Sequence, residues 1–166
     1  MRKEFAIIGA GRLGRTLGRL LLRHGHAPAG LSCRSLRSAR QARAFIGGGE
    51  PTTSNTRAAA RAALVLMATP DREIAPVARE LARARLPWAG RIVAHTSGAV
   101  SSAALEPLRP RGALLASIHP LTSIATAHPD ADFHGTPFAI EGDARAVRVL
   151  RSLVLDLGGL PVTIPR

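Results

Sequence analysis

Two histidines and one serine stand where side chains could move protons beside a small substrate. His95 and Ser97 belong to the segment His-Thr-Ser-Gly, and His119 precedes Pro120. An imidazole exchanges protons near neutral pH, and a serine hydroxyl can hold a substrate oxygen or an imine nitrogen. The candidate catalytic residues are therefore His119, Ser97 and His95. Each also has a purely structural interpretation, because such residues can cap a strand end or turn the chain before a helix.

A second group of residues has the spacing of a dinucleotide-binding turn. An apolar segment that starts at Phe5 ends in the pattern Gly-x-Gly-x-x-Gly. The first glycine permits a tight turn, the second leaves the backbone open to a diphosphate, and the third lets a helix approach the sheet. The N–H groups that open this helix would face the phosphates. The predicted diphosphate contacts are Gly9, Gly11, Arg12, Leu13 and Gly14. The alternative is a turn that serves packing alone.

The residues about 20 positions further on indicate which nucleotide would bind. NAD-binding versions of this motif carry a carboxylate there, which bonds the adenosine ribose. Residues 31–35 read Leu-Ser-Cys-Arg-Ser and hold no carboxylate. Arg34 could bind a 2′-phosphate through two N–H groups and Ser35 could add a hydroxyl, which favours NADP as the cofactor. Alternatively, Arg34 is one more surface arginine, and NAD remains open.

Strand and helix patterns alternate along the whole chain. Strands are predicted at residues 3–8, 28–33, 51–53, 64–68, 91–94, 113–118, 137–140 and 161–164. Helices are predicted at residues 12–24, 38–46, 57–63, 101–108 and 144–157. A further helix is predicted to start at a cap formed by Asp71, and residues 122–135 are predicted to form a loop. This alternation predicts a single α/β domain over residues 1–166, a Rossmann-type doubly wound, mostly parallel sheet with helices on both faces.

Ligands in such sheets bind at the carboxyl ends of the strands. The candidate residues all follow predicted strands, and so do Thr69 and Pro70, which follow the strand at 64–68. We therefore expect Thr69 and Pro70 to line the ribose and nicotinamide side of the cofactor.

Composition limits the other classes of function. The chain has 23 Lys and Arg residues against 11 Asp and Glu residues, a formal charge of +12, spread along the sequence. It has four Phe, one Trp and no Tyr, too few aromatic platforms to favour nucleic-acid binding. The longest apolar run, residues 62–68, is too short to cross a bilayer, and no signal peptide is apparent. One cysteine excludes an internal disulfide, and no His and carboxylate spacing suggests a metal. We expect a cytoplasmic protein without metal, membrane or nucleic-acid partners.

Five motifs resemble those of the 6-phosphogluconate-dehydrogenase-like superfamily, which includes pyrroline-carboxylate reductases and prephenate dehydrogenases. They are the segments at residues 8–14, 68–71, 95–99, 117–121 and 135–142. The sequence looks most similar to an uncharacterised bacterial family that pairs a Rossmann-like domain with a C-terminal helical domain of unknown function. In prephenate dehydrogenases a His-Pro pair supplies a histidine that contacts the substrate hydroxyl, assisted by a serine. By analogy those roles fall on His119 and Ser97.

The resemblance implies an NADP-dependent oxidoreductase that transfers hydride between NADP(H) and a small carbonyl, imine or hydroxyl substrate. It also implies a helical domain, missing from residues 1–166, that closes the substrate pocket and forms a homodimer. Whether this chain alone is an enzyme stays open. The alternatives are a non-catalytic NADP-sensing or regulatory module and, third, a basic nucleic-acid-binding domain.

Overall fold

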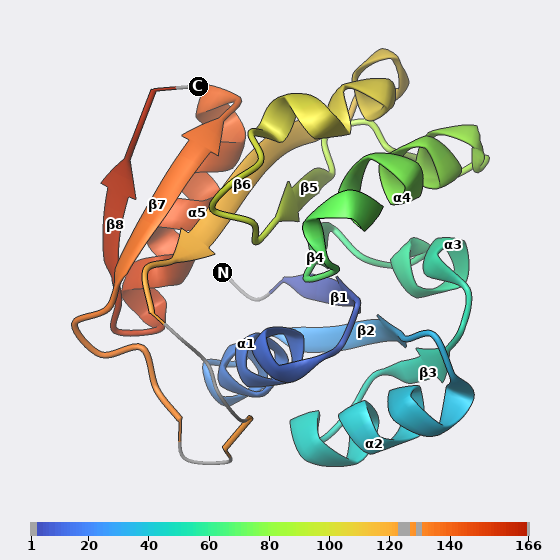
Figure 1. The fold of residues 1–166 in the computed structure, drawn as a ribbon, viewed down its shortest axis with the longest axis horizontal. Coiled ribbons are helices and arrows are strands. Elements are labelled where there is room, and N and C mark those ends of the chain that lie inside the picture. Colours follow the sequence, from blue (N-terminus) through green and yellow to red (C-terminus); the bar gives the residue numbers. More distant parts are fainter. Residues whose placement is uncertain (1–2, 123–126, 129–130, 166) are drawn as a thin grey trace. The chain divides into compact units, whose positions relative to one another are not determined.

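The computed structural model describes residues 3–122, 127–128 and 131–165. Its chain (Figure 1) divides into two compact units, and we describe each by itself. Of the described residues, the first unit holds 3–69, 127–128 and 131–132, and the second holds 70–122 and 133–165. None of the helices in the described ranges is long and apolar enough to cross a membrane.

The first unit is a parallel β-sheet with its helices. Its elements in chain order are β1 (Glu4–Ile8), α1 (Arg12–Arg23), β2 (Ala27–Ser32), α2 (Leu36–Ile46), β3 (Glu50–Thr52), α3 (Asn55–Ala59) and β4 (Leu64–Met67). The strand order is β3-β2-β1-β4, and each neighbouring pair is parallel. All four residues of β4 are buried, as a strand covered on both faces requires.

Close approaches between glycines and their neighbours show that helices cover both faces of this sheet. A Cβ on Gly14 of α1 would lie 2.9 Å from the Ile7 side chain, whereas a Cβ on Gly30 of β2 would lie 2.6 Å from Cα of Ala58 in α3. Gly30 pairs with Ala6, the neighbour of Ile7 in β1. Because successive residues of a strand face opposite sides, α1 and α3 pack on opposite faces.

The second unit contains α4 (Asp71–Arg83), β5 (Ile92–His95), the 3₁₀ helix η1 (Ser102–Arg111), β6 (Leu114–Pro120), β7 (Pro137–Gly142), α5 (Ala144–Asp156) and β8 (Leu160–Thr163). Its strand order is β5-β6-β7-β8. The β5–β6 and β7–β8 pairs are parallel, but β7 runs antiparallel to β6.

The two faces of β7 contact different elements. The Phe138 ring lies against Gly159, which follows α5, and this helix runs along β7 and β8 in Figure 1. Glu141, on the opposite face, accepts hydrogen bonds from the backbone N–H of Ser102 (2.6 Å) and from its hydroxyl (2.7 Å). The first turn of η1 is thus held against β7 by a carboxylate that is only 4% exposed.

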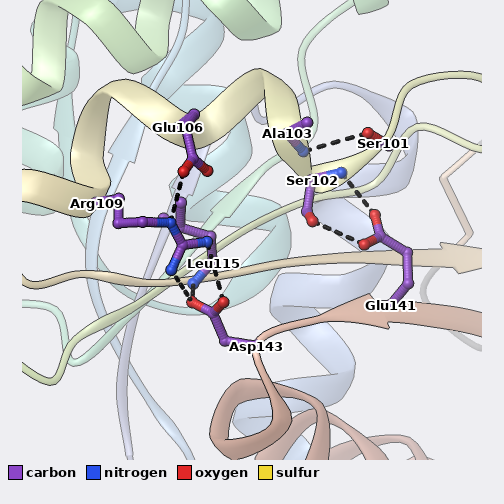
Figure 2. A network of polar contacts seen from close by, with 8 residues as sticks. All are labelled: Ser101, Ser102, Ala103, Glu106, Arg109, Leu115, Glu141 and Asp143. Atoms are coloured by element: carbon purple, nitrogen blue, oxygen red, sulfur yellow. Dashed lines mark hydrogen bonds and ion pairs between the residues drawn. The ribbon is translucent and has the colours of Figure 1, made fainter. Parts of the chain in front are cut away.

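A second carboxylate at the same end of β7 holds the other end of η1 (Figure 2). Asp143 accepts two hydrogen bonds from the Arg109 guanidinium, at 3.0 and 3.3 Å, and one from the Leu115 N–H at 2.8 Å. Arg109 also pairs with Glu106 at 2.7 Å. Together these bonds fix η1 at both ends, although Pro107 and Pro110 prevent it from forming regular α-helical bonds.

Strand β8 is the edge of the second unit and carries an apolar outer face. Leu160 and Val162 are 53% and 46% exposed, and Ile164 just beyond the strand is 42% exposed. On the other face, Arg151 of α5 donates to the carbonyl of Pro161 at 3.2 Å and to the Thr163 hydroxyl at 2.9 Å. The described helices therefore cover β8 from one side.

The predicted α/β Rossmann-type class is confirmed, and most predicted elements are present with small shifts at their ends. Three details were wrong. Asp71 does not cap α4, since Pro70 holds the cap position and Asp71 is the first helical residue. Helix α2 begins at Leu36 rather than residue 38 because the Ser35 hydroxyl caps it. His119 and Pro120 lie within β6 rather than after it, because β7 pairs with both residues.

The contact between β2 and α3 gives a test of this packing. Gly30→Ala should destabilise the protein by about 2 kcal/mol or more, since the new methyl meets the Ala58 backbone, which cannot move aside. Urea unfolding followed by circular dichroism measures the change. Gly11→Ala is the matched control, because a Cβ there approaches nothing closer than 3.9 Å. Equal stability of the two variants would contradict the packing described.

Candidate functional site

The glycine turn of the first unit is tied to the end of β2. The backbone N–H groups of Gly9 and Ala10 both donate to the carbonyl of Ser32, at 3.0 and 3.1 Å. Gly9 has a φ of 81°, and a Cβ there would lie 2.8 Å from the Thr69 methyl group. Both its conformation and its surroundings therefore require glycine.

The second and third glycines of the motif have contrasting surroundings. A Cβ on Gly11 would meet only the Gly9 carbonyl, at 3.9 Å, and Gly11 is exposed at the N-cap of α1 with no side chain capping the helix. A Cβ on Gly14 would lie 2.8 Å from that same carbonyl. The turn thus combines an open backbone at Gly11 with a close helix contact at Gly14. The first-turn N–H groups of a helix have no acceptors within the helix, so this end suits an anion.

The carbonyl of Ala10 anchors the back of the turn. It accepts hydrogen bonds from Nε of Arg15 at 3.1 Å and from Sγ of Cys33 at 3.8 Å. Arg15 also reaches the carbonyl of Ser38 in α2 at 3.4 Å. Burial raises the pKa of the Cys33 thiol, against smaller opposing effects of the Ala10 backbone and the Arg15 charge. Cys33 is therefore a protonated packing group at this turn rather than a reactive thiolate.

Arg34 and Ser35, the predicted 2′-phosphate contacts, lie between β2 and α2, and both are exposed. The Ser35 hydroxyl accepts the N–H of Ser38 at 3.1 Å and contacts the Ser38 hydroxyl at 2.9 Å. Ser35 is therefore the N-cap of α2, a role that the sequence prediction did not assign to it. The described residues between β2 and α2 include no carboxylate, so nothing there repels a phosphate.

Thr69 and Pro70 follow β4. The Thr69 hydroxyl oxygen is buried and has no hydrogen-bond partner within the described part of the chain. Its methyl group lies against Gly9, so this unpaired hydroxyl belongs to the residues that surround the glycine turn. Pro70 is exposed and starts α4.

Charge is divided unevenly along the chain. Residues 1–69 carry 12 of the 23 Lys and Arg residues but only two of the 11 Asp and Glu residues. Residues 1–69, which include the glycine turn, are therefore strongly cationic, whereas residues 70–166 carry 11 basic and nine acidic residues. Such a field raises the local concentration of anionic ligands.

In the second unit, His95 ends β5 and is fully buried. Its Nδ1 accepts the backbone N–H of Ser97 at 3.3 Å, while its Nε2 has no hydrogen-bond partner among the described residues. Burial lowers the pKa of His95, and the Ser101 backbone, Glu141 and Asp71 oppose that shift to smaller extents. A buried neutral imidazole with Nδ1 as acceptor carries its proton on Nε2.

His119 and Ser97 are more accessible. Nδ1 of His119 lies 2.9 Å from the carbonyl of Thr96. The Ser97 oxygen accepts the N–H groups of Ala99 at 3.1 Å and of Val100 at 3.2 Å, which turns the chain toward η1. The structure therefore brings all three candidate catalytic residues to the ends of β5 and β6, but only Ser97 and His119 are partly exposed. Within the described ranges, no group of three or more His, Cys, Asp or Glu residues could hold a metal ion.

Sequence comparison identifies the family. The profile of the Rossmann-like domain matches residues 1–120, nearly three quarters of the chain. The chain belongs to the Rossmann-like domain family. No curated protein matches its sequence.

Solved structures with similar folds are dehydrogenases and reductases. A provisionally named NADP oxidoreductase of Bacteroides fragilis has a TM-score of 0.83 at 19% identity, over 98% of this chain and 61% of that one. A prephenate dehydrogenase from A. aeolicus, in complex with hydroxyphenyl propionate and NAD+, has a TM-score of 0.78 at 19% identity, over 99% and 60%. A pyrroline-5-carboxylate reductase from Coxiella burnetii has a TM-score of 0.77 at 17% identity, over 100% and 60%. The chain thus spans about three fifths of the length of these structures and shares their fold.

Sequence reasoning missed two residues of the second unit that contact the His119 ring. The Thr96 carbonyl is the acceptor for His119, and Gly98 lies directly beside the His119 ring. A backbone carbonyl has no sequence signal. Gly98 adjoins the predicted Ser97, but the need for glycine there comes from the distant His119 ring, which sequence order does not show.

The buried imidazole gives a pH test. An unfolded His95 would titrate near its ordinary pKa of 6.5, whereas burial lowers the pKa in the folded protein. The unfolded state then binds more protons, so the free energy of unfolding should fall as the pH drops below about 6.5. His95→Asn should lose less stability than the wild type between pH 7.5 and pH 5, measured by urea unfolding. An identical pH dependence would show that His95 is not held neutral.

Proposed function

We propose that this chain is the NADP-binding part of an oxidoreductase that acts on a small carbonyl, imine or hydroxyl compound. The observation that carries the proposal is the open backbone at Gly11, at the N-terminus of α1, in a strand–turn–helix unit of a Rossmann-like domain. A diphosphate needs such a bare stretch of main chain at the positive end of a helix. The kinship in fold with dehydrogenases and reductases supports the same assignment.

The residues of the first unit fit NADP. The Gly11 N–H donates to the Gly9 carbonyl at 2.7 Å, so the bare Cα of Gly11 would admit the diphosphate and the N–H groups of Arg12 and Leu13 would face it, with Gly9 and Gly14 shaping the turn. The exposed Arg34 and the N-terminus of α2 at Ser35 would hold the 2′-phosphate, where NAD-binding domains have a carboxylate. The cationic character of residues 1–69 favours the more highly charged dinucleotide. Thr69, with its unpaired hydroxyl, and Pro70 would contact the ribose and nicotinamide side.

In the chemistry that we propose, bound NADP would supply or accept the hydride, as nicotinamide cofactors do. Ser97 would orient the substrate oxygen or nitrogen. Nε2 of His119, the ring nitrogen not engaged with Thr96, would take the substrate proton during oxidation and return it during reduction. His95 is fully buried, so it would not contact the substrate and would instead accept the backbone N–H of Ser97.

We also propose that a helical domain outside these 166 residues covers the apolar outer face of β8 and completes the substrate pocket. The solved structures of this fold are longer than the chain by about two fifths of their length. Leu160, Val162 and Ile164 give β8 a partly exposed apolar row of the kind that a packed helix covers. Homodimer formation would depend on that domain, and we place the protein in the cytoplasm.

Nucleotide selectivity is the direct test of the proposed cofactor. Arg34→Asp should weaken NADPH binding at least about tenfold, because one charge-assisted pair with phosphate contributes about 1.5–3 kcal/mol. NADH binding should change much less. Titration calorimetry measures both dissociation constants. Arg79→Asp makes the same charge change at an exposed position of α4 and controls for long-range electrostatics. Gly11→Ala should weaken the binding of both nucleotides. Equal loss of NADPH and NADH in Arg34→Asp would contradict the assignment to NADP, and no binding of either would contradict the whole proposal.

The apolar face of β8 gives a separate test. The chain alone should be a monomer in light scattering and should bind the apolar dye 1-anilinonaphthalene-8-sulfonate, and Leu160→Ser with Val162→Ser should reduce dye binding. Leu155→Ser on α5 replaces another leucine, 60% exposed, and serves as the control. The protein expressed with a following helical domain should bind the dye as weakly as the double variant. A native reading frame without helices after β8 would contradict this part of the proposal.

A further inference from the structure

The hydrogen bond of His119 determines which of its ring nitrogens carries the proton. A carbonyl oxygen can only accept, so Nδ1 of His119, 2.9 Å from the Thr96 oxygen, must be the protonated nitrogen. In the neutral ring, Nε2 then has a free lone pair. An exposed imidazole without such a bond exchanges between its two tautomers, so the bond to Thr96 selects one of them.

Gly98 leaves the space in which this ring lies. A Cβ on Gly98 would be 2.6 Å from Cδ2, 2.6 Å from Nε2 and 3.0 Å from Cε1 of His119. These three distances place that Cβ over one face of the imidazole, above its Cδ2–Nε2 bond, so this face packs against the bare Cα of Gly98. The φ of Gly98 is not in the positive range, so the backbone conformation alone would accept alanine. The His119 ring is what requires glycine at this position.

His95 holds the backbone on both sides of the Thr96 carbonyl. It is the final residue of β5, and its Nδ1 accepts the N–H of Ser97 at 3.3 Å. Thr96 stands between these two residues, so this bond closes a tight turn around its carbonyl. Thr96 is itself only 6% exposed. The two histidines thus have opposite tautomers, a buried one that accepts at Nδ1 and a partly exposed one that donates from it.

We propose that Gly98 and His95 are positioning residues for His119. Gly98 gives the ring its place, and His95 holds the Thr96 carbonyl that keeps the proton on Nδ1, so that Nε2 is presented as the proton acceptor. This inference rests on the proposed function for its catalytic meaning. The ring geometry itself does not depend on any cofactor.

The imidazole ¹⁵N shifts of uniformly labelled protein, recorded at a pH where His119 is neutral, report the tautomer directly. His119→Gln assigns the signals among the six histidines. The wild type should show protonated Nδ1 and unprotonated Nε2. Gly98→Ala should lose this pattern and give averaged tautomers, because the methyl group displaces the ring from Thr96.

Two substitutions at His95 separate positioning from simple packing. Asn places Oδ1 two bonds from Cβ, as His places Nδ1, so His95→Asn should retain the acceptor for Ser97 and the His119 tautomer. His95→Leu fills the space without an acceptor and should lose the tautomer. If Gly98→Ala fails to fold, these two variants still test whether His95 positions His119. Wild-type shifts in Gly98→Ala or in His95→Leu would overturn the proposal.

Binding of NADPH distinguishes this proposal from the proposed function. Gly98→Ala should bind NADPH with the wild-type dissociation constant, because it lies outside the residues assigned to the cofactor. Loss of the His119 tautomer with intact binding supports the inference. A wild-type chain that binds no nucleotide but shows the fixed tautomer would refute the proposed function and leave the positioning of His119 standing.

Discussion

The geometry of the first unit depends on one backbone acceptor, the carbonyl of Ser32. Because it receives the N–H groups of both Gly9 and Ala10, it joins the glycine turn to the end of β2. Two residues later the same strand end presents Arg34. These backbone bonds therefore tie the main chain of the glycine turn to the strand end from which the Arg34 side chain extends.

Much of this arrangement could be predicted from the sequence, because it follows from local patterns. Apolar runs separated by capping residues predict alternating strands and helices, and the glycine spacing predicts the turn that Gly9 and Gly14 form. Other features have no local signal. The antiparallel direction of β7 depends on pairing with β6, a distant segment. That pairing also extends β6 through His119 and Pro120, residues whose types suggest the end of a strand rather than its interior.

For the candidate catalytic residues as well, the residue types suggest the chemistry, whereas tertiary contacts determine which residue could perform it. His95 and His119 have the same local sequence signal, since each follows an apolar run, and the resemblance to prephenate dehydrogenases favoured His119. Burial separates them, because His95 is enclosed by its neighbours, whereas His119 is partly exposed on the Thr96 carbonyl. The buried carboxylate of Glu141 was missed for a related reason, since only the folded chain brings Ser102 within 2.7 Å of it. Residue type suggested the chemistry, and tertiary contacts assigned the roles.

Strand β8 combines an apolar face with an edge that resists strand addition. Leu160 and Ile164 donate their N–H groups inward, to Thr136 and to Ile140 of β7, so Pro161 and Thr163 between them direct their backbone outward. Pro161 has no N–H to offer, and Arg151 already occupies its carbonyl. A second chain would find few free backbone groups with which to extend the sheet. Association at β8 is thus restricted to side-chain packing on its face, and runaway edge-to-edge polymerisation is disfavoured.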